Sequence, residues 1–236
     1  MSKHLNIQFS MGSLLSGFWA PSVSICITCG QARKGESNPL EICQSCFERI
    51  PWIINIQCPI CGRPEICPDC QRGYQRYFQM NRSAVGYNQA MRDLLARYKY
   101  RGDEKLARLL GMMLYHGYIH LQNEIGKGNK TPFDCITYVP VSAERFAERG
   151  FNQAEAMALE LAKHVHLPVI PLLTRVKTTV KQSQKSRSAR FHDMRGAFSV
   201  DQNGVRVLEQ AVLAKWSKEP SPDYSRKLTI LLVDDV

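Results

Sequence analysis

Hydrophobic residues at helical spacing mark the middle of the chain. Met91, Leu94 and Tyr98 lie three or four positions apart, a spacing that places them on one face of a helix. The pattern predicts a helix from about residue 89, ended by the cations and glycine of residues 99–102. A second helix is predicted over residues 103–123, where leucine and methionine recur at the same spacing.

Short apolar runs in the second half of the chain predict strands. They lie at residues 135–139, 169–173 and 228–233, and the last is apolar or β-branched throughout, which is typical of a strand buried on both faces. Between the first two runs, Ser142 is suited to cap a short helix, and a longer helix is predicted from about Gln153. Strands that alternate with helices indicate an α/β fold with a mostly parallel sheet covered by helices.

Cysteine usage separates the first third of the chain from the rest. Eight of the nine cysteines form four Cys-x-x-Cys pairs. Two thiolates at this spacing can bind one tetrahedral ion through Zn–S bonds of about 2.3 Å, whereas disulfides do not require the spacing. The sequence therefore predicts structural zinc, held by two sets of four thiolates. The ligands are Cys26, Cys29, Cys43, Cys46, Cys58, Cys61, Cys67 and Cys70.

Two ways of grouping these pairs remain open. Sequential grouping puts the first two pairs on one ion, with loops of 13 and 5 residues inside the two sites, and a cross-braced arrangement would interleave the pairs. Sequential grouping is favoured because each half then closes locally. Four thiolates leave no open coordination position, so the metal is expected to be structural rather than catalytic. Iron is an alternative ion, since soft thiolates also accept it.

Arginines and aromatic residues interleave at the end of this cysteine-rich region. Such a surface can stack single-stranded bases, and a linker that packs its aromatics on the next domain would have the same composition. The residues are Arg63, Arg72, Tyr74, Arg76, Tyr77, Phe78 and Arg82.

The chain carries a net charge of +10, which favours a polyanionic partner. Seven cations and one acid lie between Arg175 and Arg195. This stretch is interpreted as a basic loop that either closes over a polyphosphate or contacts a nucleic-acid backbone, and a solvated loop is the plain alternative. Nothing approaches the roughly 20 apolar residues of a membrane span. Residues 9–20 are read as an apolar lead-in rather than a signal peptide, so we expect a cytoplasmic protein without membrane insertion.

Two polar motifs suggest a ligand site. Asp234 and Asp235 follow the last predicted strand, at the carboxyl end where open α/β sheets bind ligands. Residues 149–153 place an arginine and a glycine at a helix start, where backbone amides and a guanidinium can converge on phosphate. A helix boundary with ordinary polar caps would look the same.

The order of these motifs resembles the ComF family, competence-associated proteins with a zinc-finger module before a type I phosphoribosyltransferase-like domain. The resemblance covers nearly the whole chain from Cys26. It implies a lead-in at residues 1–22, a double zinc-finger or ribbon-like module at 23–80 and the phosphoribosyltransferase-like domain at 81–236. The motifs that carry it are the four Cys-x-x-Cys pairs and residues 98–102, 139–141, 148–153, 182–198 and 230–236.

The resemblance also implies roles for individual residues. The acidic pair Asp234 and Asp235 would hold the ribose hydroxyls of phosphoribosyl pyrophosphate, and Mg²⁺ would bridge its pyrophosphate and ribose oxygens. The implied substrate-binding residues are Arg149, Gly150, Asn152, Gln153, Lys181 and Arg190. The implied nucleic-acid-binding residues are Lys185, Arg187, Arg190 and Arg195.

By this resemblance the protein is expected to act in competence and DNA uptake, binding single-stranded DNA, phosphoribosyl pyrophosphate or both, beside other competence or DNA-processing proteins. The family's phosphate-binding loop would follow Val236, so we expect weak phosphoribosyl pyrophosphate binding and no turnover, since each lost amide hydrogen bond to a charged group is worth about 1.5–3 kcal/mol. The alternatives are an active phosphoribosyltransferase of nucleotide metabolism whose sequence is truncated, and an inactive zinc-dependent interaction protein.

Overall fold

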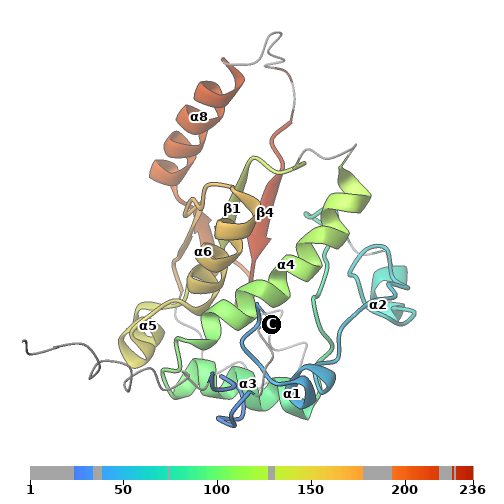
Figure 1. Ribbon diagram of the computed structural model, residues 1–236. Coiled ribbons are helices and arrows are strands. Elements are labelled where there is room, and N and C mark those ends of the chain that lie inside the picture. The colour runs from blue at the N-terminus through green and yellow to red at the C-terminus, as the bar shows by residue number, and fades with distance from the viewer. Residues whose placement is uncertain are drawn as a thin grey trace, which may run out of the picture.

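The computed structural model describes residues 24–33, 39–73, 75–126, 131–177, 193–217, 225 and 227–235. The lead-in expected at residues 1–22 lies outside the described residues. Figure 1 shows how the helices and strands are arranged. In chain order they are α1 (Gln44–Glu48), α2 (Pro68–Gln71), α3 (Gln89–Tyr100), α4 (Leu106–Ile125), β1 (Cys135–Tyr138), α5 (Ala143–Arg149), α6 (Gln153–Val165), β2 (Leu173–Arg175), β3 (Phe198–Val200), α8 (Gln202–Trp216) and β4 (Ile230–Val233).

Side-chain caps fix where the central helices begin. The Oδ1 atom of Asn88 accepts a 2.9 Å hydrogen bond from the backbone N–H of Met91 at the start of α3. Asn152 caps α6 in the same way, because a short amide side chain can satisfy backbone donors that have no partner in the first turn. The helices predicted from about residues 89 and 153 are confirmed, and the predicted cap Ser142 begins α5. None of the described helices is both long and apolar enough to cross a membrane.

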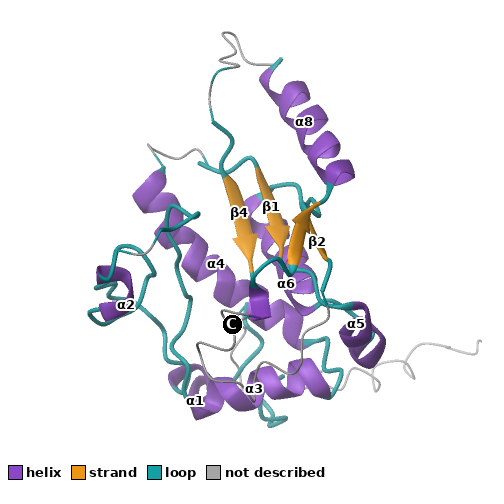
Figure 2. Ribbon diagram, turned by 180° about the vertical axis from the view of Figure 1, so that it is seen from behind, coloured by secondary structure: helices purple, strands orange, loops and turns teal. Residues whose placement is uncertain are grey.

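Helices α4 and α6 form the main helical layer and lie side by side in Figures 1 and 2. Gly111 of α4 allows their close approach, since a Cβ atom there would collide with the Cβ atom of Glu160 in α6. The small residue thus sets the distance between the helices that carry the sheet.

Strands β1 and β4 are parallel and adjacent, from the pair Cys135 and Ile230 to the pair Tyr138 and Val233. A parallel bridge between Ile136 and Val169 extends this sheet on the other side of β1. Strands β2 and β3 form a separate antiparallel pair. The predicted α/β class with a mostly parallel sheet is confirmed.

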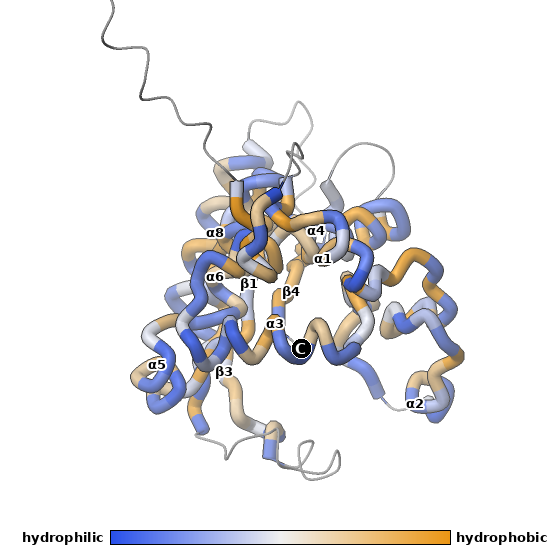
Figure 3. The backbone as a smooth tube through the Cα atoms, turned by 60° about the horizontal axis from the view of Figure 1, so that its bottom comes forward, coloured by the Kyte–Doolittle hydropathy of each residue, from blue (hydrophilic) through white to orange (hydrophobic). Residues whose placement is uncertain are grey.

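The burial of β4 differs from the prediction. Leu231 and Val233 are buried, but Ile230 and Leu232 are 42% and 53% exposed, although the strand is hydrophobic along its whole length (Figure 3). Helices α4 and α6 cover one face of the sheet, and no described helix covers the opposite face of β4 (Figure 2). The prediction of a strand buried on both faces was therefore wrong, because the burial of each face depends on what packs against it.

The strand predicted at residues 169–173 is divided between two sheets in the structure. The backbone N–H of Ile136 donates to the carbonyl of Pro168, and Ile170 N–H donates to the carbonyl of Ile136, so pairing with β1 is confined to residues 168–170. Pro171 follows and has no N–H to donate. The chain then enters β2 at Leu173, in the other sheet.

The cysteine-rich region packs directly on α3 and α4. Ile42 and Ile50 belong to the same buried core as Leu94 of α3. The guanidinium of Arg97 donates to the carbonyls of Thr28 and Ile27. The two expected domains thus share one hydrophobic core, and α3 is the element that joins them.

Candidate functional site

The first cysteine cluster consists of Cys26, Cys29, Cys43 and Cys46. Gly30 closes the first turn with φ of +75°, which glycine adopts readily, and Cys43 is the N-cap residue of α1. All four Sγ atoms lie within 4.8 Å of one another. The Sγ atoms of Cys29 and Cys43 are 3.7 Å apart, close to the edge of about 3.8 Å that a tetrahedron with Zn–S bonds of 2.3 Å requires.

The second cysteine cluster repeats this geometry. Gly62 has φ of +73°, and a Cβ atom on it would lie 2.7 Å from the carbonyl oxygen of Asn81, so the turn requires glycine. Cys67 is the N-cap residue of α2. The four Sγ atoms, which again lie within 4.8 Å of one another, belong to Cys58, Cys61, Cys67 and Cys70.

These two groups confirm sequential grouping of the pairs and exclude the cross-braced alternative for the described geometry. Hydrogen bonds from the Ser45 hydroxyl and the Cys46 backbone N–H lower the pKa of Cys43 to about 6, whereas burial raises the pKa of Cys46 to about 12. Four thiols this close cannot all ionise without a cation. The donor set and its dimensions fit a structural zinc ion in each cluster.

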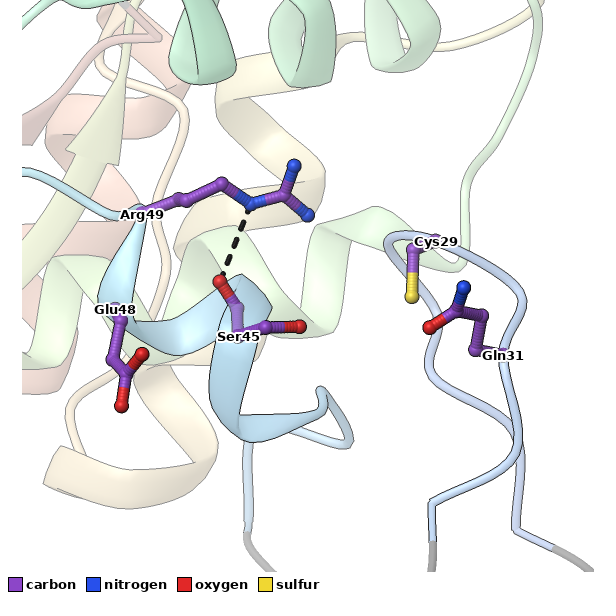
Figure 4. Close-up of a pocket in the computed structure, with 5 residues that line it drawn as sticks. All are labelled: Cys29, Gln31, Ser45, Glu48 and Arg49. Carbon is purple, nitrogen blue, oxygen red and sulfur yellow. Dashed lines mark hydrogen bonds between the residues drawn. The ribbon is translucent and has the colours of Figure 1, made fainter.

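A cavity of about 610 Å³ lies beside the first cysteine cluster. Figure 4 shows Glu48 at the end of α1, Arg49 directly after it and Cys29 on the facing turn. Arg49 donates to the Ser45 carbonyl at 3.2 Å and to the Sγ atom of Cys46 at 3.1 Å. This arginine can therefore offset thiolate charge in the first cysteine cluster.

The acidic pair lies where the sequence placed it, directly after β4. The backbone N–H of Asp235 donates to Oδ1 of Asp234 at 2.8 Å. Partial desolvation, followed by the charge of Asp235, raises the pKa of Asp234 to about 6. Lys99 of α3 forms a 3.0 Å ion pair with Oδ2 of Asp235. The Asp235 carboxylate is thus paired with a lysine, whereas Asp234 is exposed to solvent at the end of the strand.

Residues 149–153, which the sequence predicts as a phosphate site, lie at the α5–α6 junction and contact one another. Gly150 ends α5 with φ of +82°, and Asn152 caps α6 while its Nδ2 donates to the Val139 carbonyl at 3.3 Å. Gln153 is only 1% exposed, and its Oε1 accepts a 2.7 Å hydrogen bond from Arg149. Asn152 and Gln153 are therefore buried residues that hold the junction together. Arg149 is partly exposed.

Arg149 is held in place from two sides. Besides its bond to Gln153, its guanidinium lies over the ring of Tyr100, 5.2 Å from the centroid. Its Nε atom is buried and has no hydrogen-bond partner in the described structure. A cavity of about 150 Å³ adjoins it, lined by Lys99, Tyr100, Gly102, Glu148 and Arg149.

Sequence reasoning missed Lys99 and Tyr100 as site residues. Their stretch was read as an ordinary basic helix end, although it was one of the motifs shared with the ComF family. The structure places Lys99 between the acidic pair and the cavity beside Arg149, which connects the two motifs predicted separately.

Curated proteins similar to this chain include two competence proteins. The chain is 31% identical to competence protein ComFC of Streptococcus pneumoniae (strain ATCC BAA-255 / R6) over 183 residues, which make up 70% of this chain and 75% of that protein. This chain belongs to the ComF family. It is also 31% identical to competence protein ComFC of Bacillus subtilis (strain 168) over 160 residues, 64% of this chain, and spans 62% of that protein's length.

A third relative of this ComF-family chain is DNA utilization protein YhgH of Salmonella typhimurium. The two are 26% identical over 165 residues, 68% of this chain and 71% of that protein. No protein-family model matches the chain, and no solved structure is significantly similar to it.

The remaining predicted residues lie in the basic segment before β3. Lys181, Lys185, Arg187 and Arg190 lie outside the described residues, and their roles stay predictions. Arg195 is exposed, and its carbonyl accepts a 3.1 Å hydrogen bond from Lys177. At the other end of this segment, burial lowers the pKa of Arg175, and the nearby charge of Asp234 opposes that shift. Arg175 is therefore a further cation close to the acidic pair.

Proposed function

We propose that this protein acts in DNA uptake or utilisation by binding single-stranded DNA on the second cysteine cluster. The names of its relatives, competence and DNA utilization proteins, support the general role. The observation that carries the binding proposal is the exposed segment 75–79, in which every residue is exposed. Tyr77 is 90% exposed and Phe78 51%, and adjacent exposed aromatics are a stacking platform for bases.

Cations beside this segment suit a phosphate backbone. The side chains of Arg63 and Arg72 are 46% and 62% exposed, and they share Asp69 at 3.6 and 3.8 Å, so a phosphate would compete with one carboxylate for two cations. Arg76 precedes the two aromatics. Stacked bases and neutralised phosphates are the two contributions on which sequence-independent binding of single strands rests. Arg82 has a different role, because it is buried and paired with Glu124. Tyr74 lies outside the described residues.

The metal cluster anchors the chain that follows the exposed segment. The backbone N–H of Asn81 donates to the Ile60 carbonyl at 2.7 Å, and its side chain donates to the Cys61 carbonyl at 3.3 Å. Arg82 donates to the Pro59 carbonyl at 3.0 Å. Zinc in the second cluster would therefore hold the stacking platform in shape.

Fluorescence anisotropy with a labelled oligothymidylate tests this proposal. The variant Tyr77→Ala/Phe78→Ala should bind more weakly, because each stacked base is worth about 1–3 kcal/mol, or roughly 5- to 150-fold per aromatic. Tyr87→Ala is the matched control, since Tyr87 is a 69% exposed tyrosine outside the segment. Equal affinity of the double variant and the control would refute the platform.

The acidic pair favours a second function, binding of a phosphoribosyl ligand. Ionised Asp234 and Asp235 are hydrogen-bond acceptors suited to two ribose hydroxyls. Arg149 lines the adjoining cavity and can donate hydrogen bonds to phosphate oxygens. The only clusters of three or more metal-ligating side chains among the described residues are those of cysteine. Magnesium would thus be held mainly by ligand oxygens and water.

Titration calorimetry with phosphoribosyl pyrophosphate tests the second function. Binding should require magnesium and should be lost in Asp234→Asn/Asp235→Asn, because an amide cannot supply the charge of a carboxylate. Magnesium-independent binding, or unchanged binding by the double variant, would count against it.

A further inference from the structure

Lys99 of α3 links the acidic pair to the cavity beside Arg149. We propose that Lys99 is a phosphate-binding residue, oriented toward the cavity by its ion pair with Asp235. This inference rests on the phosphoribosyl site proposed above. The ligand class is a phosphate ester or pyrophosphate whose sugar hydroxyls reach the acidic pair.

The ion pair is sheltered. The Nζ atom of Lys99 lies 3.0 Å from Oδ2 of Asp235, and the two side chains are only 18% and 13% exposed. Exposed pairs are screened by water and contribute little, but a pair this covered interacts more strongly and restricts where the ammonium group can lie. Lys99 also lines the cavity of about 150 Å³. Its three N–H donors therefore exceed what Asp235 alone uses.

The cavity has the charge and size for one phosphoryl group. Lys99 and Arg149 contribute two cations, and the single acid in the lining, Glu148, pairs with Arg145. A volume of 150 Å³ corresponds to about five water molecules at roughly 30 Å³ each. The buried Nε atom of Arg149 has no partner within the described residues. This atom is an unsatisfied donor of a residue that lines the cavity, although protein atoms cover it.

Lys99 would also reduce the repulsion between an anionic ligand and the acidic pair. A phosphate beside Arg149 and a sugar at the acidic pair would bring the anionic groups of ligand and protein close together. Like charges at such separations disfavour binding unless a cation lies between them. Lys99 occupies that position, bonded to one carboxylate and facing the cavity.

The neighbours of Lys99 in the chain hold it rigidly. Tyr98 is fully buried, and its hydroxyl donates to the Gln153 carbonyl at 3.0 Å. Arg97 binds the first cysteine cluster through Thr28 and Ile27 and pairs with Asp103 at 2.6 Å. The helix that carries Lys99 is therefore fixed before any ligand arrives, which lowers the entropy lost on binding.

Calorimetric titration with inorganic pyrophosphate and with phosphoribosyl pyrophosphate tests the role of Lys99. Lys99→Met should weaken the binding of both probes at least tenfold, and Lys99→Arg should retain most of it. Lys163→Met is the matched control, because Lys163 is a 65% exposed lysine of α6 that also pairs with a carboxylate, that of Glu160 at 2.6 Å. A Lys99→Met variant that binds both probes within twofold of the wild type would overturn the proposal. Absence of binding by the wild type would instead overturn the phosphoribosyl site itself, and this inference with it.

A double variant separates phosphate contact from mere neutralisation of Asp235. Pyrophosphate has no ribose, so the sugar-binding role of Asp235 does not enter. If Lys99 contacts phosphate, Lys99→Met/Asp235→Asn should bind pyrophosphate as weakly as Lys99→Met. If removal of the Asp235 charge restores wild-type affinity, Lys99 only neutralises that carboxylate and the proposal is wrong. Circular dichroism of each variant confirms that it is folded.

Discussion

At the scale of single residues, the sequence predicts a site correctly where the site depends on the spacing of nearby residues. The eight cysteines of the two clusters follow from their four pairs, and Gly30 and Gly62 have the positive φ that such turns require. Lys99 was missed because its partner Asp235 lies near the other end of the chain, and a lysine in the last turn of a helix has an ordinary explanation in the helix dipole. Only the fold brings the two together.

Asp234 should destabilise the fold at neutral pH. Partial desolvation and the neighbouring charge of Asp235 raise its pKa from 3.8 to about 6, so the folded state binds a proton more readily than the unfolded state does. Stability is therefore lowered above about pH 6 and recovered as the pH falls through this range to about 4. Asp234→Asn should be more stable than the wild type at pH 8, by less than about 1 kcal/mol, because Asp234 is exposed and solvent screens its charge.

Urea unfolding at pH 8 and pH 4 checks this, with Asp93→Asn, at an exposed position of α3, as the control. The stabilisation should shrink towards zero at pH 4. A variant that is less stable than the wild type at pH 8 would show that the carboxylate is well solvated or fully paired. A residue that lowers stability while occupying a ligand site is typical of a functional role.

At the scale of elements, helices were predicted more reliably than strands. The starts of α3 and α6 follow from local caps and apolar spacing, which the sequence carries within a few residues. The exposed face of β4 and the short pairing after Pro168 depend on which distant segments pack or pair there. The spacing of apolar residues within a strand does not show which distant segment will pack against it.

The crossing of α4 and α6 gives a prediction at this scale. Gly111→Ala should destabilise the protein by about 1–3 kcal/mol, because the added methyl group overpacks the contact with Glu160. Gly117→Ala, in the same helix, meets its nearest neighbour at an ordinary 3.5 Å and should be neutral or stabilising by up to about 1 kcal/mol. Denaturant midpoints of the two variants test this, and equal midpoints would contradict the tight crossing.

At the scale of the whole molecule, the two cysteine clusters should have different roles. The shared core of the described residues includes Cys26 and Cys46 of the first cluster and no cysteine of the second. The second cluster instead anchors the chain next to the exposed segment 75–79. Two clusters with the same ligands thus support different parts of the protein.

Cys26→Ser/Cys29→Ser should lower the thermal midpoint of the whole protein, since loss of the first metal loosens the core around α3. Cys58→Ser/Cys61→Ser should leave that midpoint less affected and should weaken oligothymidylate binding. Differential scanning calorimetry and anisotropy on both variants separate the effects. The assignment fails if the two variants have the same losses in both measurements.

The salt dependence of single-stranded DNA binding tests the central claim most directly. The logarithm of the oligothymidylate association constant should fall linearly with the logarithm of salt concentration, and Arg72→Ala/Arg76→Ala should reduce the slope by about 1.4, or about 0.7 for each lost cation. Tyr77→Ala/Phe78→Ala should lower affinity at every salt concentration with the slope unchanged, because stacking releases no counterions.

Arg187→Ala/Arg190→Ala measures, by the same change in slope, how much the basic segment contributes to DNA binding. Salt-independent binding, or a slope that neither arginine pair changes, would contradict the account.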